Sequence, residues 1–233
     1  MIADNIKSLR ARIAEICIKV NRHPDDVKLI AVSKNFGVPE ILEASDEGIN
    51  DFGENKAQEL DAKYQQLGNK ITWHFIGHLQ RNKVALVVKS ADYIHSVDSL
   101  QIAMEINKRA EKINKVQKIL LEIKTSDEET KSGLSDESEI IDIANYCKEF
   151  KNIELTGLMT IAPFTNDRNL IRKSFKYLRN LKDNLKSNNI LLQDLSMGMT
   201  DDFDIAIEEG ATILRIGTAI FGERDYSIKT DEL

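Results

Sequence analysis

Lys34 is the first residue whose position suggests chemistry. It follows the run VKLIAVS, in which Val27, Leu29 and the stretch Ile30 to Val32 have the apolar character of a buried strand. A lysine here can simply mark where the strand meets water, since most lysines are exposed. Alternatively, its amine lies in a partly desolvated site near another cation. Such a site lowers the pKa of an amine, and the neutral amine attacks aldehydes to form a Schiff base.

Two glycine-containing loops late in the chain offer a place for a phosphate. SMGMT covers residues 196–200 and RIGTA covers residues 215–219, and each joins an apolar run to a predicted helical turn. Backbone N–H groups at a helix start point at an anion, and Ser196, Thr200 or Thr218 would add hydroxyl donors. Serine and threonine also cap helices without any ligand. Either loop alone favours capping, whereas the two together favour a phosphate site.

Arg215 lies inside the last apolar run, between Leu214 and Ile216. If side chains alternate, it shares a face with Ile213 and Gly217. A buried charge needs a partner, so a salt bridge to a strand carboxylate or an exposed sheet edge would also explain it. An amine, a guanidinium and a phosphate cradle would together suit pyridoxal 5′-phosphate, which carries an aldehyde, a phosphate and an aromatic nitrogen. The spacing alone does not single out this compound.

Other polar residues near the apolar runs have ordinary explanations as well. Asn55 either contacts the cofactor or caps the helix that follows it. His74, His78 and His95 lack the fixed short spacing of a zinc site, so no metal is expected. His74 is more typical of a satisfied structural histidine, although it would also fit the wall of a cofactor pocket. Lys131, in the charged loop SDEETKSG, is either solvated or a second amine for a cofactor in transit.

The elements that must position these residues alternate along the chain. After a leading helix at about residues 2–20, short β-branched or apolar runs alternate with longer stretches of helical period. Eight predicted strands linked through helices imply parallel strands with right-handed crossovers, which close naturally into a (β/α)₈ TIM barrel. A doubly wound sheet is the alternative, but SKNFG after the first run lacks the glycine-rich dinucleotide fingerprint.

We therefore predict an α/β protein: a single (β/α)₈ TIM barrel with an extra N-terminal helix, forming one domain over residues 1–233. The stretch contains no linker rich in Pro, Gly or Ser. In this fold, function gathers at the C-terminal ends of the strands. Lys34, Asn55 and the two glycine-containing loops follow predicted strands, so they are expected at one end of the barrel, whereas Arg215 and His74 lie within predicted strands.

Composition narrows the classes of partner. The 233 residues carry a formal net charge of −6, with 42% hydrophobic and 30% charged residues, which is ordinary for a soluble globular protein. The acidic balance argues against nucleic acid as a partner. No apolar run is long enough to span a membrane, and the N-terminus is not a secretory signal. Cys17 and Cys147 lie far apart in helical patterns, so we expect buried free thiols and a cytoplasmic protein.

Several long motifs, in order, resemble one known family. LIAVSKNFG, GINDFGENKAQE, WHFIGHLQRNK, IHSVDS, KSGL, LTGLMTIAP and SMGMTDDFDIAIEEGATILRIGTAIFG are similar to the pyridoxal-phosphate homeostasis proteins of the YggS/PROSC type. These proteins resemble in fold the N-terminal barrel of bacterial alanine racemase. The resemblance runs from about Val27 to Gly222.

This resemblance implies a set of roles. Lys34 would carry pyridoxal 5′-phosphate as an internal aldimine, and Ser196, Gly217 and Thr218 would hold its phosphate. Arg215 would face the pyridine nitrogen. An arginine donates hydrogen bonds and accepts none, so that nitrogen would stay unprotonated and would support carbanion chemistry poorly.

The resemblance also bears on catalysis and partners. The second domain that supplies the opposing acid or base in alanine racemase is expected to be missing. We therefore expect a non-catalytic or very weakly catalytic protein of intracellular cofactor homeostasis, which buffers pyridoxal 5′-phosphate or delivers it to PLP-dependent apoenzymes. A monomer or weak dimer is expected, without nucleic acid or membrane partners. Two alternatives stay open: a PLP-dependent amino-acid racemase or lyase, and an enzyme whose Lys34 forms a Schiff base with a sugar phosphate.

Overall fold

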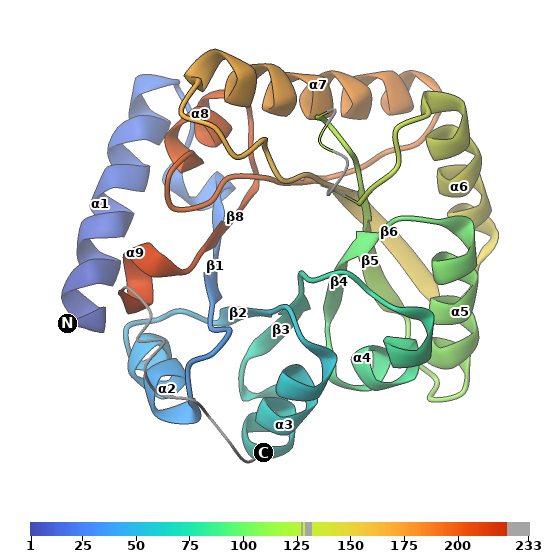
Figure 1. Ribbon diagram of the computed structural model, residues 1–233, viewed down its shortest axis with the longest axis horizontal. Coiled ribbons are helices and arrows are strands. Elements are labelled where there is room, and N and C mark those ends of the chain that lie inside the picture. The colour runs from blue at the N-terminus through green and yellow to red at the C-terminus, as the bar shows by residue number, and fades with distance from the viewer. Residues whose placement is uncertain (127, 129–131, 223–233) are drawn as a thin grey trace.

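A closed barrel of parallel strands, surrounded by helices, forms the centre of the molecule (Figure 1). The computed structural model describes residues 1–126, 128 and 132–222. The strands follow one another around the barrel in chain order, and β1 pairs with β8 to close it. The predicted (β/α)₈ TIM barrel with an extra N-terminal helix is therefore confirmed.

The strands are short, as is usual for a barrel of this kind. They are β1 (Lys28–Val32), β2 (Asp51–Glu54), β3 (Thr72–Phe75), β4 (Tyr93–Val97), β5 (Gln117–Glu122), β6 (Ile153–Met159), β7 (Asp194–Ser196) and β8 (Ile213–Ile216). Most of their residues are buried, because one face meets the barrel interior and the other meets the helices. Some of their sequences, such as KLIAV and QKILLE, accordingly carry consecutive apolar residues rather than a strict alternation.

The helices form the outer layer. They are α1 (Ile2–Lys19), α2 (Val38–Asp46), α3 (Ala57–Leu67), α4 (Val84–Ser90), α5 (Leu100–Glu111), α6 (Glu137–Glu149), α7 (Arg168–Ser187), α8 (Phe203–Glu208) and α9 (Thr218–Phe221). Three short 3₁₀ turns, η1 (Pro24–Asp26), η2 (Gly68–Lys70) and η3 (Arg81–Lys83), lie between them. Each long helix buries a stripe of apolar residues against the barrel wall.

The leading helix α1 covers the barrel next to its last elements. Ile2, Ile6, Leu9 and Ile13 recur every three or four residues and are all buried. This stripe packs against α8 and α9, so the first helix meets the last two of the described chain (Figure 1). The side-chain amide of Asn5 donates a hydrogen bond to the carbonyl of Ile220 at 2.9 Å. The start of the chain thus supports the turn that follows β8.

Local contacts set several helix boundaries. α3 begins at Ala57, three residues after Glu54, which is the buried last residue of β2. η3 precedes α4 as a separate turn, since the N–H of Lys83 bonds to the carbonyl of Gln80 three residues before it. Ser99 caps α5 through its hydroxyl, which accepts from the N–H of Ile102 at 3.4 Å.

Candidate cofactor-binding site

Four neighbouring strands bring the predicted site residues to one end of the barrel. Lys34 follows β1, Asn55 follows β2, Ser196 ends β7, and Gly217 and Thr218 follow β8. The strands are parallel, and β1 pairs with both β2 and β8 while β7 pairs with β8. All five residues therefore lie at the C-terminal ends of adjacent strands, where barrels of this type carry their functional sites.

The turn that carries Lys34 is held by a buried network of charges. Lys34 itself is half-buried. The ammonium of Lys63 donates to the carbonyl of Ser33 at 2.9 Å, to Glu54 Oε1 at 2.7 Å and to Glu59 Oε1 at 2.8 Å. The hydroxyl of Ser33 also donates to Glu54 Oε1, at 2.6 Å. This network joins the end of β1 to β2 and α3 directly beneath the lysine.

Asn35 completes the turn in a left-handed conformation, with φ of 67°. Its N–H donates to Glu59 Oε1 at 2.6 Å, so the same carboxylate binds Lys63 and the turn. The next residue, Phe36, stacks on Phe221 of α9 with ring centroids 4.8 Å apart. The turn after β1, which carries Lys34, therefore packs against α9, the helix after β8.

Burial raises the pKa of Glu54 to about 7, although the neighbouring charge of Lys63 lowers it. The carboxyl group is 0% exposed, and the desolvation of its charged form outweighs the attraction of the ammonium. A carboxyl group bonded to Ser33, the residue before Lys34, therefore titrates close to neutral pH.

The loops after β7 and β8 approach each other closely. Gly198 has φ of 97°, and a Cβ atom at this residue would lie 2.6 Å from the Cβ of Ala206. The N–H of Arg215 donates to the carbonyl of Gly198 at 2.9 Å, which ties the loop after β7 to β8. The N–H of Ala219 donates to the hydroxyl of Thr200 at 3.4 Å. Thr200, which the sequence only offered as one of three hydroxyls, thus lies between the two loops.

Gly217 gives the second loop its approach to β1. A Cβ atom at Gly217 would lie 3.4 Å from the carbonyl oxygen of Val32 and 3.5 Å from its Cβ, so a larger side chain would meet the end of that strand. Thr218 begins α9 and is exposed. Backbone N–H groups in the first turn of a helix have no partner earlier in the helix. Those of Ala219 and Ile220 bond to Thr200 and to the carbonyl of Gly217, so Thr218 is the residue of α9 left to offer a donor at the barrel mouth.

Asn55 does not cap the next helix, because the residue at the N-cap of α3 is Lys56. Gly77, after β3, lies so close that a Cβ atom there would be 2.1 Å from the carbonyl oxygen of Asn55. The amide oxygen Oδ1 of Asn55 is buried without a hydrogen-bond partner in the described part of the chain. Buried polar atoms rarely stay unpaired, so this oxygen is available to a donor on a ligand.

Arg215 lies in the barrel interior and is only 4% exposed. It donates from Nη1 to the hydroxyl of Ser196 at 2.6 Å and from Nη2 to the carbonyl of Thr160 at 2.8 Å. Burial lowers the pKa of the guanidinium to about 10, although the carboxylates of Asp202 and Glu122 raise it. The group stays charged at neutral pH and is fixed by β6 and β7. The strand carboxylate that the sequence suggested as a partner is not a hydrogen-bond partner among the described residues.

The hydrogen bonds that join Ser196 to two histidines were not predicted from the sequence. Ser196 is 0% exposed, and its hydroxyl contacts both Arg215 and His95. His95 and His74 are also fully buried and contact each other at 2.9 Å. His74 is thus satisfied in the core, as expected. Only the closed barrel reveals that it belongs to a chain of polar groups ending at Arg215.

Two further carboxyl groups surround the mouth. Burial raises the pKa of Glu122, at the end of β5, and one of its oxygens has no hydrogen-bond partner in the described residues. Burial also raises the pKa of Asp202, which accepts a hydrogen bond from the N–H of Met199 at 2.6 Å.

Two other residues considered in the sequence remain. The ring nitrogen Nδ1 of His78 lies 3.5 Å from Oδ2 of Asp98. Lys131, the predicted second amine, lies outside the described residues.

The described residues hold neither a metal cluster nor a membrane-spanning helix. Among residues 1–126, 128 and 132–222, no three His, Cys, Asp or Glu side chains are arranged to hold a metal ion. Within the same residues, no helix is both long and apolar enough to cross a membrane. The donor set at the barrel mouth is instead an amine, a guanidinium, an amide and two loops with hydroxyls. This set fits a compound with an aldehyde, a ring nitrogen and a phosphate.

Known proteins of similar sequence and structure agree with this geometry. A family model described as the N-terminal domain of alanine racemase matches residues 4–225. The pyridoxal phosphate homeostasis protein of Aquifex aeolicus (strain VF5) is 41% identical over 225 residues, which cover 96% of this chain and 98% of that protein. The protein of the same name from Escherichia coli (strain K12) is 39% identical over 236 residues, covering 98% and 99%.

Solved structures extend the comparison. PipY of Synechococcus elongatus PCC7942, solved with PLP bound, superimposes with a TM-score of 0.84 at 34% identity and covers 95% of this chain and 100% of that one. An alanine racemase of Clostridium difficile 630 has a TM-score of 0.76 at 16% identity, covering 98% of this chain and 59% of that one, and shares the fold. The chain belongs to the family of pyridoxal phosphate homeostasis proteins, within the wider family described as the N-terminal domain of alanine racemase.

Proposed function

We propose that this chain binds pyridoxal 5′-phosphate covalently through Lys34 and serves in cofactor homeostasis, by buffering or delivery. The amine would condense with the aldehyde and release water. One observation carries the proposal: Lys34, Asn55, Arg215 and the two loops that hold Ser196, Gly217 and Thr218 lie on four adjacent strands at the mouth of one barrel. The relative PipY, which has been solved with PLP bound, supports it.

The remaining residues would each meet one part of the cofactor. Gly217 and Thr218, together with Ser196, would hold the phosphate at the loops after β7 and β8. Arg215 would donate to the ring nitrogen, because two of its N–H groups are fixed by protein acceptors and the others remain for a ligand. Asn55 would accept a hydrogen bond through its unpaired Oδ1.

We further propose that the protein has little or no turnover. A guanidinium cannot accept a hydrogen bond, so it would leave the ring nitrogen unprotonated and the cofactor a poor electron sink. The homologues compared above are named for homeostasis rather than for a reaction. The two cysteines, Cys17 and Cys147, are both free and buried, as is usual in a reducing compartment, and we place this function in the cytoplasm. PLP-dependent apoenzymes would receive the cofactor from a monomer or weak dimer.

One observation favours a second candidate, a PLP-dependent amino-acid racemase or lyase. Glu122 is buried at the barrel mouth, where burial raises its pKa, and a carboxyl group with a perturbed pKa in a cleft is a candidate acid or base. This candidate predicts rapid exchange of the α-proton when the protein with bound cofactor meets amino acids in D₂O. Exchange no faster than with free cofactor, followed by NMR, would eliminate it.

The covalent link is tested by replacing Lys34 with alanine. The wild-type protein should develop visible absorbance with pyridoxal 5′-phosphate, and borohydride should fix the cofactor on the peptide that contains Lys34. Lys34→Ala should lose the absorbance while the phosphate loops still retain some cofactor. The matched control is Lys28→Ala, which removes a lysine from the opposite end of the same strand. An unchanged spectrum in Lys34→Ala, or labelling of another peptide, would refute the assignment.

A further inference from the structure

A continuous chain of polar side chains crosses the barrel from Arg215 to its opposite end. Ser196 Oγ lies 2.9 Å from His95 Nδ1, His95 Nε2 lies 2.9 Å from His74 Nδ1, and His74 Nε2 lies 2.8 Å from Asp51 Oδ1. With the bond from Arg215 to Ser196 at 2.6 Å, these contacts join β8, β7, β4, β3 and β2. We call these five residues the relay.

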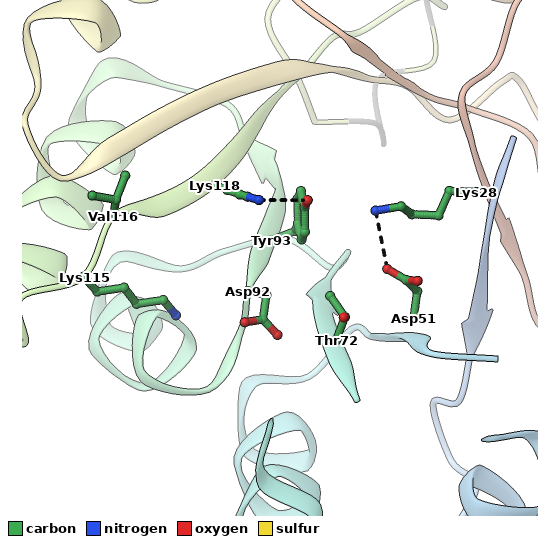
Figure 2. Close-up of a pocket in the computed structure, with 8 residues that line it drawn as sticks. All are labelled: Lys28, Asp51, Thr72, Asp92, Tyr93, Lys115, Val116 and Lys118. Carbon is green, nitrogen blue, oxygen red and sulfur yellow. Dashed lines mark hydrogen bonds and ion pairs between the residues drawn. The ribbon is translucent and has the colours of Figure 1, made fainter. Parts of the chain in front are cut away.

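The far end of the relay opens into a cavity of about 370 Å³ at the N-terminal ends of the strands. Figure 2 shows Asp51 in this cavity, with Lys28 pointing toward it at 3.6 Å. Lys118 points toward the hydroxyl of Tyr93 at 3.3 Å in the same view. The relay therefore runs from the proposed cofactor site to a second face of the barrel that solvent can reach.

The groups at the two ends of the relay fix the direction in which its hydrogen bonds donate. Arg215 can only donate. Asp51 is an acceptor, because the hydrogen bond from His74 and the charge of Lys28 lower the pKa of its carboxyl although burial opposes them. His74 must then carry its proton on Nε2 and accept on Nδ1. It follows that His95 donates from Nε2 and accepts on Nδ1, and that Ser196 gives its hydroxyl proton to His95.

Both imidazoles are neutral in this arrangement. Burial lowers the pKa of His74, although Asp51 raises it, and burial lowers that of His95 further, with the neighbouring His74 and Arg215 acting in the same direction. The only hydroxyl proton of Ser196 therefore points into the core. In this state Ser196 has no proton to give to an anion at the barrel mouth.

One added proton reverses the relay. If His74 becomes an imidazolium, it donates from Nδ1 to His95 Nε2. The single proton of His95 then lies on Nδ1 instead of Nε2 and is donated to Ser196. Ser196 Oγ now accepts from both His95 and Arg215, and its hydroxyl keeps one proton, which points toward the mouth. The proton balance is simple: one proton enters from solvent, and the positive charge rests on His74 beside the carboxylate of Asp51 at 2.8 Å.

We propose that His95 and His74 are positioning residues for the anion site, because they decide whether the hydroxyl of Ser196 points into the core or toward a bound phosphate. An anion that takes a hydrogen bond from Ser196 and a proton that enters the histidine pair therefore stabilise each other, as binding linkage requires. This inference rests on the proposed function only for the identity of the anion.

Charged and titratable groups from several strands surround the pair. His74 stacks on the ring of Tyr93, with centroids 4.6 Å apart and an angle of 11° between the rings. The other groups that influence the two imidazoles are Asp51, Lys28, Asp92 and Arg215. Of these carboxylates, Asp51 is the one that hydrogen-bonds to an imidazole of the pair, namely His74, so the added proton should rest on His74 rather than on His95.

The direct test is NMR of the wild-type protein labelled with ¹⁵N in its histidines. The chain has four histidines, so the ring signals can be assigned with single variants. In the free protein at about pH 8, His74 and His95 should both be neutral with the proton on Nε2. Saturation with pyridoxal 5′-phosphate should move the proton of His95 to Nδ1 and make His74 doubly protonated. Unchanged ring signals in the saturated protein would overturn the proposal, as would a free protein with Nδ1–H on either ring.

A binding measurement provides the second test. Sulfate keeps the same charge between about pH 6 and pH 8, so a pH dependence of its affinity reports the protein alone. Wild-type affinity should rise by up to about tenfold for each unit of decreasing pH, because one proton is taken up. His95→Asn and Ser196→Ala should each flatten this dependence, whereas His78→Asn, which changes an exposed histidine outside the relay, should keep it. Equal slopes in all four proteins would contradict the proposal.

Failure of the relay can be told apart from failure of the proposed function. If pyridoxal 5′-phosphate produces no absorbance with the wild-type protein, the proposed function is wrong, yet the predicted Nε2–H state of both free histidines remains a valid test. If the absorbance forms normally and the histidine rings do not respond, the proposed function stands and the relay proposal is wrong.

Discussion

Glu54 shows how a single buried carboxyl group shapes the site. It receives hydrogen bonds from Ser33 and Lys63 on the same oxygen, while its other oxygen has no partner in the described residues. These hydrogen bonds only partly replace the water that the carboxylate loses on burial. Desolvation of its charged form is therefore the largest effect on its pKa and raises it. It lies under the turn that carries Lys34, so its protonation state bears on the stability of that turn.

Glu54 predicts a specific dependence of stability on pH. Its folded pKa of about 7 lies above its ordinary value of 4.5, so the folded protein holds a proton that the unfolded chain has released between these values. This contribution to the free energy of unfolding is complete below about pH 4.5 and falls by at most about 3 kcal/mol as the pH rises to about 7. Glu54→Gln should lack this fall.

Urea denaturation of both proteins at about pH 5, 6, 7 and 8 measures the effect. As the pH rises across this range, the free energy of unfolding of Glu54→Gln should increase relative to that of wild type. The difference between the two proteins should level off above the folded pKa of Glu54. Glu59→Gln, in the same network but half-buried, serves as the comparison. Parallel curves for wild type and Glu54→Gln would show that the carboxyl titrates normally.

At the scale of elements, α1 is an integral part of the packed barrel. Its apolar stripe packs against α8 and α9, and α9 carries Thr218 in the proposed phosphate loop. Loss of packing on α1 should therefore affect both stability and the loop after β8.

Two isoleucines of α1 offer a matched pair. Ile6 is 0% exposed and Ile18 is 67% exposed on the same helix. Ile6→Ala should lower the free energy of unfolding by about 2–5 kcal/mol, because it removes a buried side chain and leaves a cavity. Ile18→Ala should change it by less than about 0.5 kcal/mol. Denaturant unfolding measures both, and similar losses in the two variants would contradict the packing described for α1.

The loop after β7 depends on a glycine for two separate reasons. Gly198 and Gly210 have similar φ values, 97° and 93°, but only Gly198 has a close neighbour, since the nearest atom to a Cβ at Gly210 lies 3.6 Å away. Gly210→Ala should therefore report the backbone strain alone, about 1–3 kcal/mol. Gly198→Ala should cost about 2 kcal/mol more through overpacking against Ala206, and it should also weaken binding of pyridoxal 5′-phosphate. A loss no greater than that of Gly210→Ala would mean that the loop can move aside freely.

At the scale of the whole molecule, closure of the barrel makes the site a product of the entire chain. The first and last strands pair with each other, and the relay joins five strands through the interior. We therefore expect the single domain predicted for residues 1–233 to unfold as one unit. A bound cofactor should stabilise all of it.

Thermal unfolding tests this expectation. The one tryptophan, Trp73, is fully buried in β3, so its fluorescence reports on the barrel, while circular dichroism reports on the helices. The two probes should give one coincident transition. Pyridoxal 5′-phosphate at about 100 times its Kd should raise the Tm by roughly 5–10 °C, and Lys34→Ala should lose most of this shift. Two separate transitions would show that the chain contains more than one folding unit.

The sequence by itself determined the alternation of elements, the closed barrel and the position of Lys34 at the end of its first strand. These features follow from hydrophobic period and from turn residues, which are local properties of the chain. It also pointed to the loops that contain Gly217 and Thr218, because glycine and hydroxyl residues at a strand end are visible without knowledge of the fold. The family motifs support the same residues.

Only the tertiary structure decided which polar residues meet. Ser196 and His95 are 101 residues apart, and Ser33 and Lys63 are 30 apart, yet each pair forms a hydrogen bond in the closed barrel. A histidine in an apolar run looks the same in the sequence whether it contacts one carboxylate or completes a relay. Its partner is fixed by barrel closure and side-chain register, which bring distant strands together and leave no periodic signal in the sequence.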